Sequence, residues 1–221
     1  EEAARLTRRL RLFLVDHEEG KTVSVRLGGD VYRVGTSGSN GHFAGRIRLD
    51  DAEVARLLER PRARDAWLAF EAVLPPRDTR RFVGYVQLVG PGGLSVISDL
   101  DDTIKHTEVT DTRAMLRNTF LREFQAVPDM AGLYAKAAVR GAVFHYVSAS
   151  PWQLAEPLTE FLRREGFPRG SLRLRYFRLD DASGLNTVLG SSQEYKHRAI
   201  GRILAAFPER RFLLVGDSGE H

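Results

Sequence analysis

Residues 10–90 contain short apolar runs in which hydrophobic and polar positions alternate, as at Val23, Val25 and Leu27. Alternation with a period of two is typical of half-buried antiparallel strands. Turn-forming residues, such as Gly28-Gly29-Asp30 and the stretch 35–41, separate the runs. We therefore expect strands at residues 10–15, 22–27, 31–34, 43–49, 67–74 and 82–89, and a helical turn over residues 51–58. Such a series of strands predicts a small β-sandwich-like domain.

A different rhythm follows Gly90-Pro91-Gly92-Gly93, which is a natural domain boundary. Apolar runs now alternate with segments of helical period, and strands separated by helices indicate a parallel sheet that is covered on both faces. The expected strands are residues 94–98, 142–147, 172–177 and 211–215. Four helices are expected between and after these strands. The first follows Asp111, with Leu116, Phe120 and Phe124 on one face, and the second begins at Pro128. The third carries Leu158, Phe161 and Leu162 before Gly166, and the fourth spans residues 193–207. The sequence thus predicts a β-rich accessory domain, residues 1–92, and an α/β domain, residues 93–221.

Composition narrows the chemistry that this protein can use. The 221 residues include no cysteine, which excludes disulfides, thiolate nucleophiles and cysteine-bound metal sites. The 33 Lys and Arg residues against 29 Asp and Glu give a net charge of +4 with no basic block, so we expect no nucleic-acid partner. No apolar run approaches the roughly 18 residues of a membrane span. We expect a cytoplasmic protein that is soluble or peripheral to a membrane.

Polar residues follow three of the predicted strands, in the segments 98–103, 148–152 and 216–220. In α/β folds, ligands bind at this carboxyl edge of the sheet. Several carboxylates crowded together repel one another unless a cation joins them, which predicts a divalent ion, most simply Mg²⁺. A calcium-binding EF-hand loop starting at Asp99 would need glycine at 104 and glutamate at 110, but these residues are Ile104 and Thr110.

The same segments resemble the motifs of the haloacid dehalogenase (HAD) superfamily of phosphotransferases. Asp99-Leu100-Asp101-Asp102-Thr103 is similar to the first motif, Ser148 to the second, Lys196 to the third and Gly216-Asp217 to the opening of the fourth. More narrowly, the chain resembles the catalytic region of actin-patch-type phosphatidate phosphatases and their bacterial relatives, in residues 97–103, 115–120, 146–152 and 216–221. The resemblance covers residues 94–221 and implies a HAD-like Rossmannoid parallel sheet with little or no cap.

The resemblance also implies a role for each motif residue. Asp99 would attack phosphorus and form an aspartyl-phosphate, and Asp101 would be the general acid and then the general base. Asp99, Asp217 and the main-chain carbonyl of Asp101 would hold Mg²⁺. Ser148 would donate a hydrogen bond to a phosphoryl oxygen, and Lys196 would stabilise the phosphate and the Asp99 charge. Further substrate-binding residues would be Thr103, Ala149, Ser150, Arg117 and Trp152.

Lys196 can also be placed from its helix alone. It precedes Ile200 by one turn and therefore shares the stripe that faces the sheet. It lies near the amino end of that helix, which is the end beside the carboxyl edge of the strands. The alternative is an exposed, charge-balanced position, since Glu194 and Arg198 flank it.

Structural alternatives exist for the other residues. Asp99, Asp101 and Asp217 are residue types that also form turns, and Ser148 could be a turn hydroxyl with Ser150 taking its place at the site. Trp152 would line a pocket for lipid or leaving group, or pack under the following helix. The remaining expectations are a turn cap for Asp102, a solvated face for Lys105, and structural or exposed positions for His106, His145 and His197.

Together these observations predict a Mg²⁺-dependent phosphate monoester hydrolase. The substrate that the resemblance implies is phosphatidate at a membrane surface. One alternative is a phosphatase for a soluble metabolite, a phosphoprotein or a nucleic-acid end, which would use the same residues. Another is a non-catalytic module that binds phosphate or a partner. The second acidic residue of the fourth motif is expected shortly after His221, so we also expect the catalytic domain to be cut short there.

Overall fold

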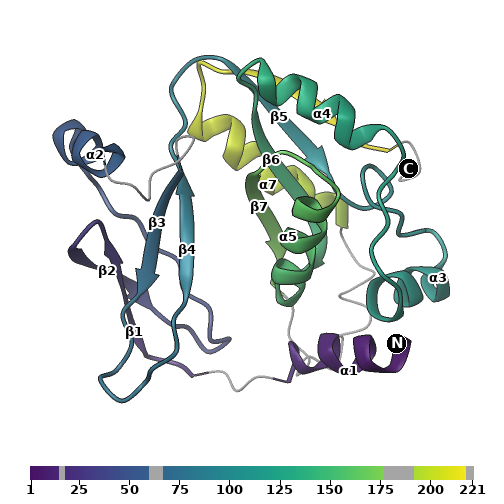
Figure 1. Ribbon diagram of the computed structural model, residues 1–221, viewed down its shortest axis with the longest axis horizontal. Coiled ribbons are helices and arrows are strands. Elements are labelled where there is room, and N and C mark those ends of the chain that lie inside the picture. The colour runs from purple at the N-terminus through teal and green to yellow at the C-terminus, as the bar shows by residue number, and fades with distance from the viewer. Residues whose placement is uncertain (15–17, 60–66, 177–191, 218–221) are drawn as a thin grey trace. The chain divides into compact units, whose positions relative to one another are not determined.

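The computed structural model describes residues 1–14, 18–59, 67–176 and 192–217, and the chain divides into two compact units. One unit combines Glu1–Val15 with Gly90–His221, and the other is Asp16–Val89. Each contains one four-stranded sheet (Figure 1). The described helices include none that is long and apolar enough to cross a membrane.

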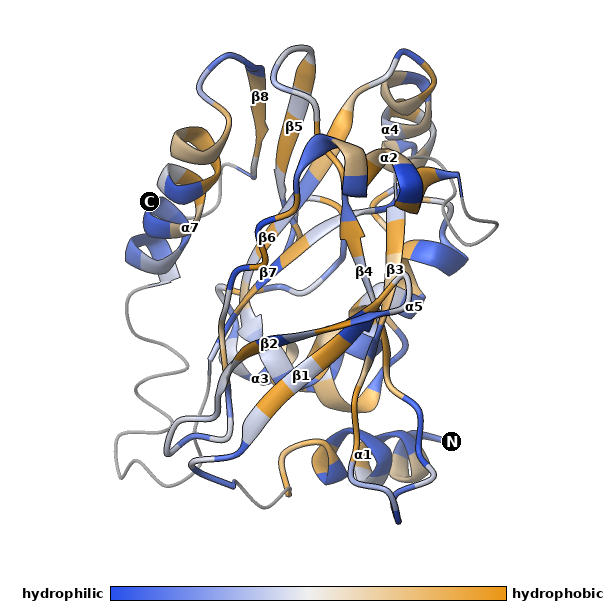
Figure 2. Cartoon of the chain, turned by 90° about the vertical axis from the view of Figure 1, so that its left-hand side faces the viewer, coloured by the Kyte–Doolittle hydropathy of each residue, from blue (hydrophilic) through white to orange (hydrophobic). Residues whose placement is uncertain are grey.

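The unit Asp16–Val89 is built on an antiparallel sheet with the order β2-β1-β3-β4. Its strands are β1 (Thr22–Leu27), β2 (Asp30–Thr36), β3 (Trp67–Ala72) and β4 (Val83–Gln87). Apolar and polar residues alternate along β1 (Figure 2), where Val25 and Leu27 are buried. Gly28 and Gly29, both with positive φ, make the tight turn from β1 to β2. The predicted strands 22–27, 31–34, 67–74 and 82–89 are thereby confirmed within a few residues.

Two predictions for this unit are wrong. Residues 43–49 form no strand, and the described residues build a single sheet rather than the two facing sheets of a sandwich. The helical turn is confirmed as α2 (Asp51–Leu58). It begins with a capping box, in which the Asp50 side chain accepts from the Glu53 N–H and the Glu53 side chain accepts from the Asp50 N–H. Local hydrogen bonds fix this helix, so its bounds could be predicted from sequence.

The other unit is built on a parallel sheet with the order β7-β6-β5-β8. The strands are β5 (Leu94–Asp99), β6 (Val143–Pro151), β7 (Gly170–Arg175) and β8 (Arg211–Val215). In the central pairs, Asp99 lies opposite Val147 and Ser98 lies opposite Val215. The ends of β5, β6 and β8 therefore meet at one edge of the sheet. Figure 2 shows β5 and β8 as largely apolar. Strand β5 is buried, as expected of a strand between helical layers, whereas Leu213 and Leu214 of the edge strand β8 are exposed.

Helices cover both faces of this sheet, as predicted. One face packs against α4 (Met130–Val139) and α5 (Ala155–Arg164), in a core that includes Val96, Phe144 and Phe161. The opposite face packs against α7 (Ser192–Ala206) through Ile97 and other residues of a smaller core, Val147, Ala199 and Ile203. The odd and even positions of β5 and β6 thus point to different helical layers.

The predicted strand at residues 10–15 is wrong, because α1 (Glu2–Arg11) is a helix. Leu10, Leu12 and Leu14 alternate as in a strand, but the preceding residues are good helix formers with an acidic start and a basic last turn. The helix belongs to the same unit as the parallel sheet. Near its end, Phe13 packs 5.7 Å from Phe120, measured between ring centroids.

The segment that follows β5 contains a shorter helix than predicted. Asp111 caps α3 (Thr112–Leu116) by accepting from the N–H groups of Arg113 and Ala114, which confirms its role as a cap. A π-helix (Arg117–Leu121) follows directly. The wider turn of the π-helix breaks the predicted helix face of Leu116, Phe120 and Phe124, and Leu116 is 39% exposed. Phe120 and Phe124 still contribute to the larger core, but Phe124 lies beyond the helix.

Candidate active site

Three polar segments meet at the carboxyl edge of the parallel sheet. Asp99 is the last residue of β5, Ser148 lies in the last part of β6, and Gly216-Asp217 follows β8. Because Asp99 pairs with Val147 in the parallel register, Ser148 is placed one residue further along the neighbouring strand. Topology therefore brings together residues that are far apart in the sequence.

The Asp99 carboxylate faces α7. Its Oδ1 lies 3.2 Å from Nζ of Lys196, and its Oδ2 accepts a long hydrogen bond of 3.5 Å from Oγ1 of Thr103. The side chains of Asp99 and Lys196 are 10% and 14% exposed. Lys196 is directed to this site because Ala199, one turn further along α7, packs on the sheet. The structure thus places the predicted nucleophile beside the predicted cation and excludes the exposed position considered for Lys196.

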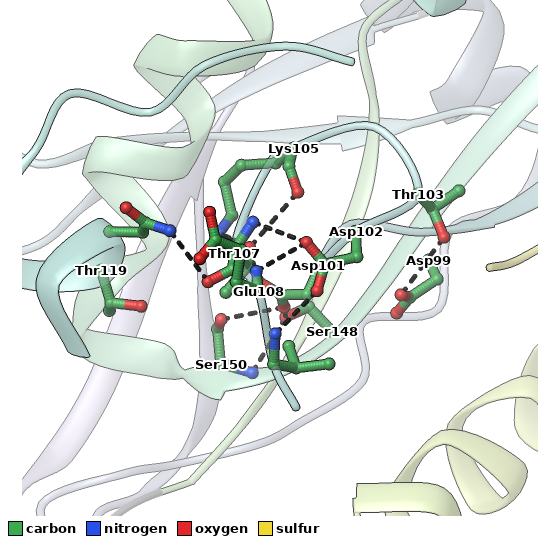
Figure 3. A network of polar contacts seen from close by, with 12 residues as sticks. Asp99, Asp101, Asp102, Thr103, Lys105, Thr107, Glu108, Thr119, Ser148 and Ser150 are labelled. Carbon is green, nitrogen blue, oxygen red and sulfur yellow. Dashed lines mark hydrogen bonds and ion pairs between the residues drawn. The ribbon is translucent and has the colours of Figure 1, made fainter. Parts of the chain in front are cut away.

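The Asp101 carboxylate faces β6 and is much more tightly held. Its Oδ2 accepts from Oγ of Ser148 at 2.6 Å and from Oγ of Ser150 at 3.1 Å. Its Oδ1 accepts from Oγ1 of Thr107 at 2.8 Å and lies 2.8 Å from Nζ of Lys105. The Ser148 hydroxyl also accepts from the N–H of Ser150 at 2.9 Å. Figure 3 shows this cluster and, apart from it, Asp99 beside Thr103.

These contacts determine the charge of Asp101. Burial alone would raise the pKa of its carboxyl. The charge of Lys105 and the hydrogen bonds from Lys105, Ser148 and Thr107 outweigh burial and hold the pKa well below its ordinary value. In this arrangement Asp101 is a carboxylate at neutral pH, which is the form that accepts a proton.

Lys105 is the largest departure from expectation at this site. A solvated face was predicted for it, but the residue is 1% exposed and its ammonium lies between the Asp101 carboxylate and the Phe124 ring. The nitrogen is 4.9 Å from the ring centroid. Thr107, also missed, is 2% exposed and bonds both Lys105 and Asp101. The i, i+4 spacing of Asp101 and Lys105 was the one signal of this pair in the sequence.

Asp102 has the structural role that was predicted. Its carboxylate accepts from the N–H groups of Thr107, Glu108 and Val109 at 2.7 to 2.8 Å. Its φ of 57° places it in the left-handed region, which closes the loop after β5. This loop carries Asp101 back toward Lys105, since the N–H of Asp102 donates to the Lys105 carbonyl at 2.8 Å.

The other residues expected at the substrate lie around the same edge or outside it. Ser150 joins the Asp101 cluster, and Ala149 lies between it and Ser148 in β6. Trp152 is 39% exposed and lies 6.2 Å from Tyr176 between ring centroids, so it does not pack under α5. Arg117 begins the π-helix and is exposed.

The residues expected to bind a metal can be tested by their positions and chemistry. The described residues contain no cluster of three or more His, Asp or Glu side chains suited to a metal ion. Asp99 nevertheless ends β5, and Asp217 follows the neighbouring parallel strand β8; such strands lie about 4.8 Å apart, and both residues offer carboxylate oxygens. Two carboxylates with a main-chain carbonyl fit a Mg²⁺ ion, which retains several waters. The side chain of Asp101 is already occupied by Lys105 and three hydroxyls, so only its carbonyl suits this role.

An acidic, lysine-flanked edge on a parallel sheet with helices on both faces is an arrangement of α/β phosphoryl-transfer enzymes. Comparison with known families makes this class specific. The chain belongs to the family described as "Phosphatidate phosphatase APP1, catalytic domain", whose model matches residues 94–221. This confirms the expected family, and it places the chain in a family of phosphatases.

Two curated proteins illustrate the similarity. The chain is 42% identical over 137 residues to "Phosphatidate phosphatase APP1" of Saccharomyces cerevisiae, which covers 60% of this chain and 23% of that protein. It is 28% identical over 145 residues to an uncharacterized protein of Schizosaccharomyces pombe, which covers 64% of this chain and 23% of that protein. The chain thus spans about a quarter of the length of these relatives.

Proposed function

We propose that this chain catalyses the Mg²⁺-dependent hydrolysis of a phosphate monoester, with phosphatidate as substrate and diacylglycerol as product. The observation that carries the proposal is the pairing of Asp99 Oδ1 with Lys196 Nζ at 3.2 Å, at the strand edge where Ser148 also lies. Membership of a phosphatidate phosphatase family supports the choice of substrate.

In the first step, a carboxylate oxygen of Asp99 would attack phosphorus while the bond to the leaving oxygen breaks. Lys196 would stabilise the charge on the transferring group, because its ammonium already lies beside Asp99. Ser148 would turn its hydroxyl from Asp101 to a phosphoryl oxygen. The departing alkoxide needs a proton, and Asp101 is the carboxyl closest along the chain to supply it.

In the second step, water would attack the aspartyl-phosphate, and Asp101 would accept its proton. Inorganic phosphate then leaves and the Asp99 carboxylate is restored. The carboxylate form that Lys105 favours suits this second step. The first step needs the protonated form, and a phosphate dianion bound beside Asp101 would raise its pKa toward that form.

Asp99, Asp217 and the Asp101 carbonyl would hold Mg²⁺ at this edge of the sheet. When bound, the ion would neutralise charge on the phosphoryl group and on the clustered carboxylates. The exposed ring of Trp152 lies on the same strand end as Ser150 and would contact the apolar leaving group.

Phosphate release tests the proposal. We expect release from vesicles of phosphatidate in phosphatidylcholine when Mg²⁺ is present, and its loss with EDTA. Asp99→Asn should lower the rate by about 10⁴-fold or more, whereas Asp30→Asn in the antiparallel sheet, a matched change at an exposed position, should not. Undiminished release by the Asp99 variant would rule out the mechanism. Release from glycerol 3-phosphate but not from vesicles would retain the reaction and reject the substrate.

A further inference from the structure

Lys105 carries a buried charge beside the proposed acid–base residue Asp101. It is 1% exposed, and its ammonium contacts Oδ1 of Asp101 and the hydroxyl of Thr107. Removing two charges from water costs several kcal/mol per ion, and well-packed apolar residues often replace buried ion pairs without loss of stability. Stability alone is therefore a poor explanation for this pair.

The pair holds one oxygen of Asp101 and leaves the other directed toward β6. Lys105 and Thr107 both contact Oδ1, while Oδ2 is directed at the hydroxyls of Ser148 and Ser150 on β6. With Oδ1 held from one side, the carboxylate cannot rotate freely about its side-chain torsions. Figure 3 shows the carboxylate between these two groups of donors.

Lys105 in turn packs on Phe124, a buried residue whose ring also contacts the guanidinium of Arg9 in α1. The Lys105 nitrogen lies 4.9 Å and the Arg9 guanidinium carbon 4.0 Å from the ring centroid. Arg9 is 4% exposed and donates to the carbonyls of Thr119, in the middle of the π-helix, and of Arg122, just after it. Arg9 of α1, which lies outside the residues 94–221 that match the family, thus contacts the same ring as Lys105.

We propose that Lys105 is a positioning residue that orients Asp101 to take a proton from the attacking water, and that α1 supports it through Arg9 and Phe124. The inference rests on the proposed function. In the step concerned, the water oxygen bonds to phosphorus, its proton passes to Asp101, and the bond between phosphorus and Asp99 breaks. Lys105 touches neither water nor phosphorus and acts through Asp101.

The test is the level of phosphorylated enzyme during turnover of p-nitrophenyl phosphate. This substrate has a good leaving group, so formation of the aspartyl-phosphate needs little help from Asp101, and its hydrolysis needs the base. In Lys105→Met we expect a burst of p-nitrophenol and accumulation of acid-quenched phosphoenzyme, with dephosphorylation slowed by about 10²-fold. Lys136→Met, at an exposed position on α4, is the matched control and should behave as wild type.

Two further changes keep the test decisive if Lys105→Met does not fold. Thr107→Val has nearly the same shape and removes only the hydroxyl that bridges Lys105 and Asp101. We expect a smaller burst of the same kind, with dephosphorylation slowed by about fivefold. Arg9→Gln should give the same signature more weakly, and Arg8→Gln, an exposed neighbour on α1, should not.

The outcomes separate this inference from the proposed function. If Lys105→Met, or Thr107→Val where the first does not fold, keeps wild-type phosphoenzyme levels, positioning by Lys105 is refuted. The same holds if formation and hydrolysis of the phosphoenzyme slow equally, since a general loss of structure would do that. A wild-type chain that releases no phosphate from any monoester would instead refute the proposed function.

Discussion

Asp99 and Asp101 are two residues apart in the sequence, yet the fold gives them opposite surroundings. Asp99 lies beside one lysine and a distant hydroxyl at 3.5 Å, next to the strand that carries Asp217. Asp101 is held by one lysine and three hydroxyls, all within 3.1 Å. The two side chains are about equally buried, at 10% and 9% exposed, so the contrast lies in the donors that contact each carboxylate. The several donors on Asp101 suit a group that must be oriented for acid–base work.

The largest effect that separates the two carboxylates should be on stability. Asp101→Asn leaves the buried Lys105 charge without its counter-charge, and we expect a loss of about 3–5 kcal/mol in the free energy of unfolding. Asp99→Asn should cost less, because the Lys196 side chain is 14% exposed whereas Lys105 is 1% exposed, so the charge left without its partner is less completely removed from water. Urea unfolding of both variants at pH 7 measures the contrast. Equal losses would show that the two sites are not packed differently in solution.

A second prediction concerns His145, a buried polar residue of the same sheet that lies outside the site. Its ring nitrogens hydrogen-bond the hydroxyls of Ser171 and Ser95, and burial, assisted by Arg173 and Arg210, lowers its pKa from 6.5 to about 4. The folded state thus favours the neutral ring, so this contribution to stability is complete above pH 6.5. It is lost as the pH falls toward 4, by about 3 kcal/mol in total.

His145→Gln should therefore flatten the pH dependence of unfolding between pH 6.5 and 4.5. His106→Gln is the matched control, since His106 is exposed and both variants keep every carboxylate. Unfolding curves that stay parallel for the two variants would contradict the prediction. A lowered catalytic rate in His145→Gln at pH 7, with its fold intact, would show that the hydrogen bonds of His145 to Ser95 and Ser171 affect the active site.

The smallest effects should come from the hydroxyls on each carboxylate. Ser148 donates to Asp101 at 2.6 Å, and Ser148→Ala should lower kcat by about 10-fold to 100-fold, because it also removes a proposed donor to the phosphoryl group. Thr103 reaches Asp99 only at 3.5 Å, and Thr103→Val should lower kcat by about threefold. Steady-state kinetics on one monoester compare the pair. A larger loss of kcat in Thr103→Val than in Ser148→Ala would contradict the conclusion that Asp101 is held more tightly than Asp99.

Several elements of both units could be predicted because local patterns decide them. The capping box fixes α2, Asp111 caps α3, and the stripe of α7 that directs Lys196 toward the sheet is visible in its apolar spacing. Strand β1 has the predicted bounds, since its alternation is regular and a glycine turn ends it. The failures lie where two patterns compete, as at Leu10, Leu12 and Leu14, whose alternation suggested a strand near the end of a helix.

By itself, the sequence indicated that carboxylates and hydroxyls follow parallel strands, that Lys196 lies near the amino end of a helix beside them, and that a ligand site is expected at this carboxyl edge. The phosphoryl-transfer role of the site came from the family resemblance. Only the tertiary structure decided which of these groups contact one another. Lys105 shows why: a lysine with acidic neighbours in the sequence is ordinarily solvated, but this one is buried beside Phe124, whose ring also contacts Arg9 of α1. A contact between residues about 100 positions apart leaves no periodic signal, because it is set by how elements pack and not by local conformational preference.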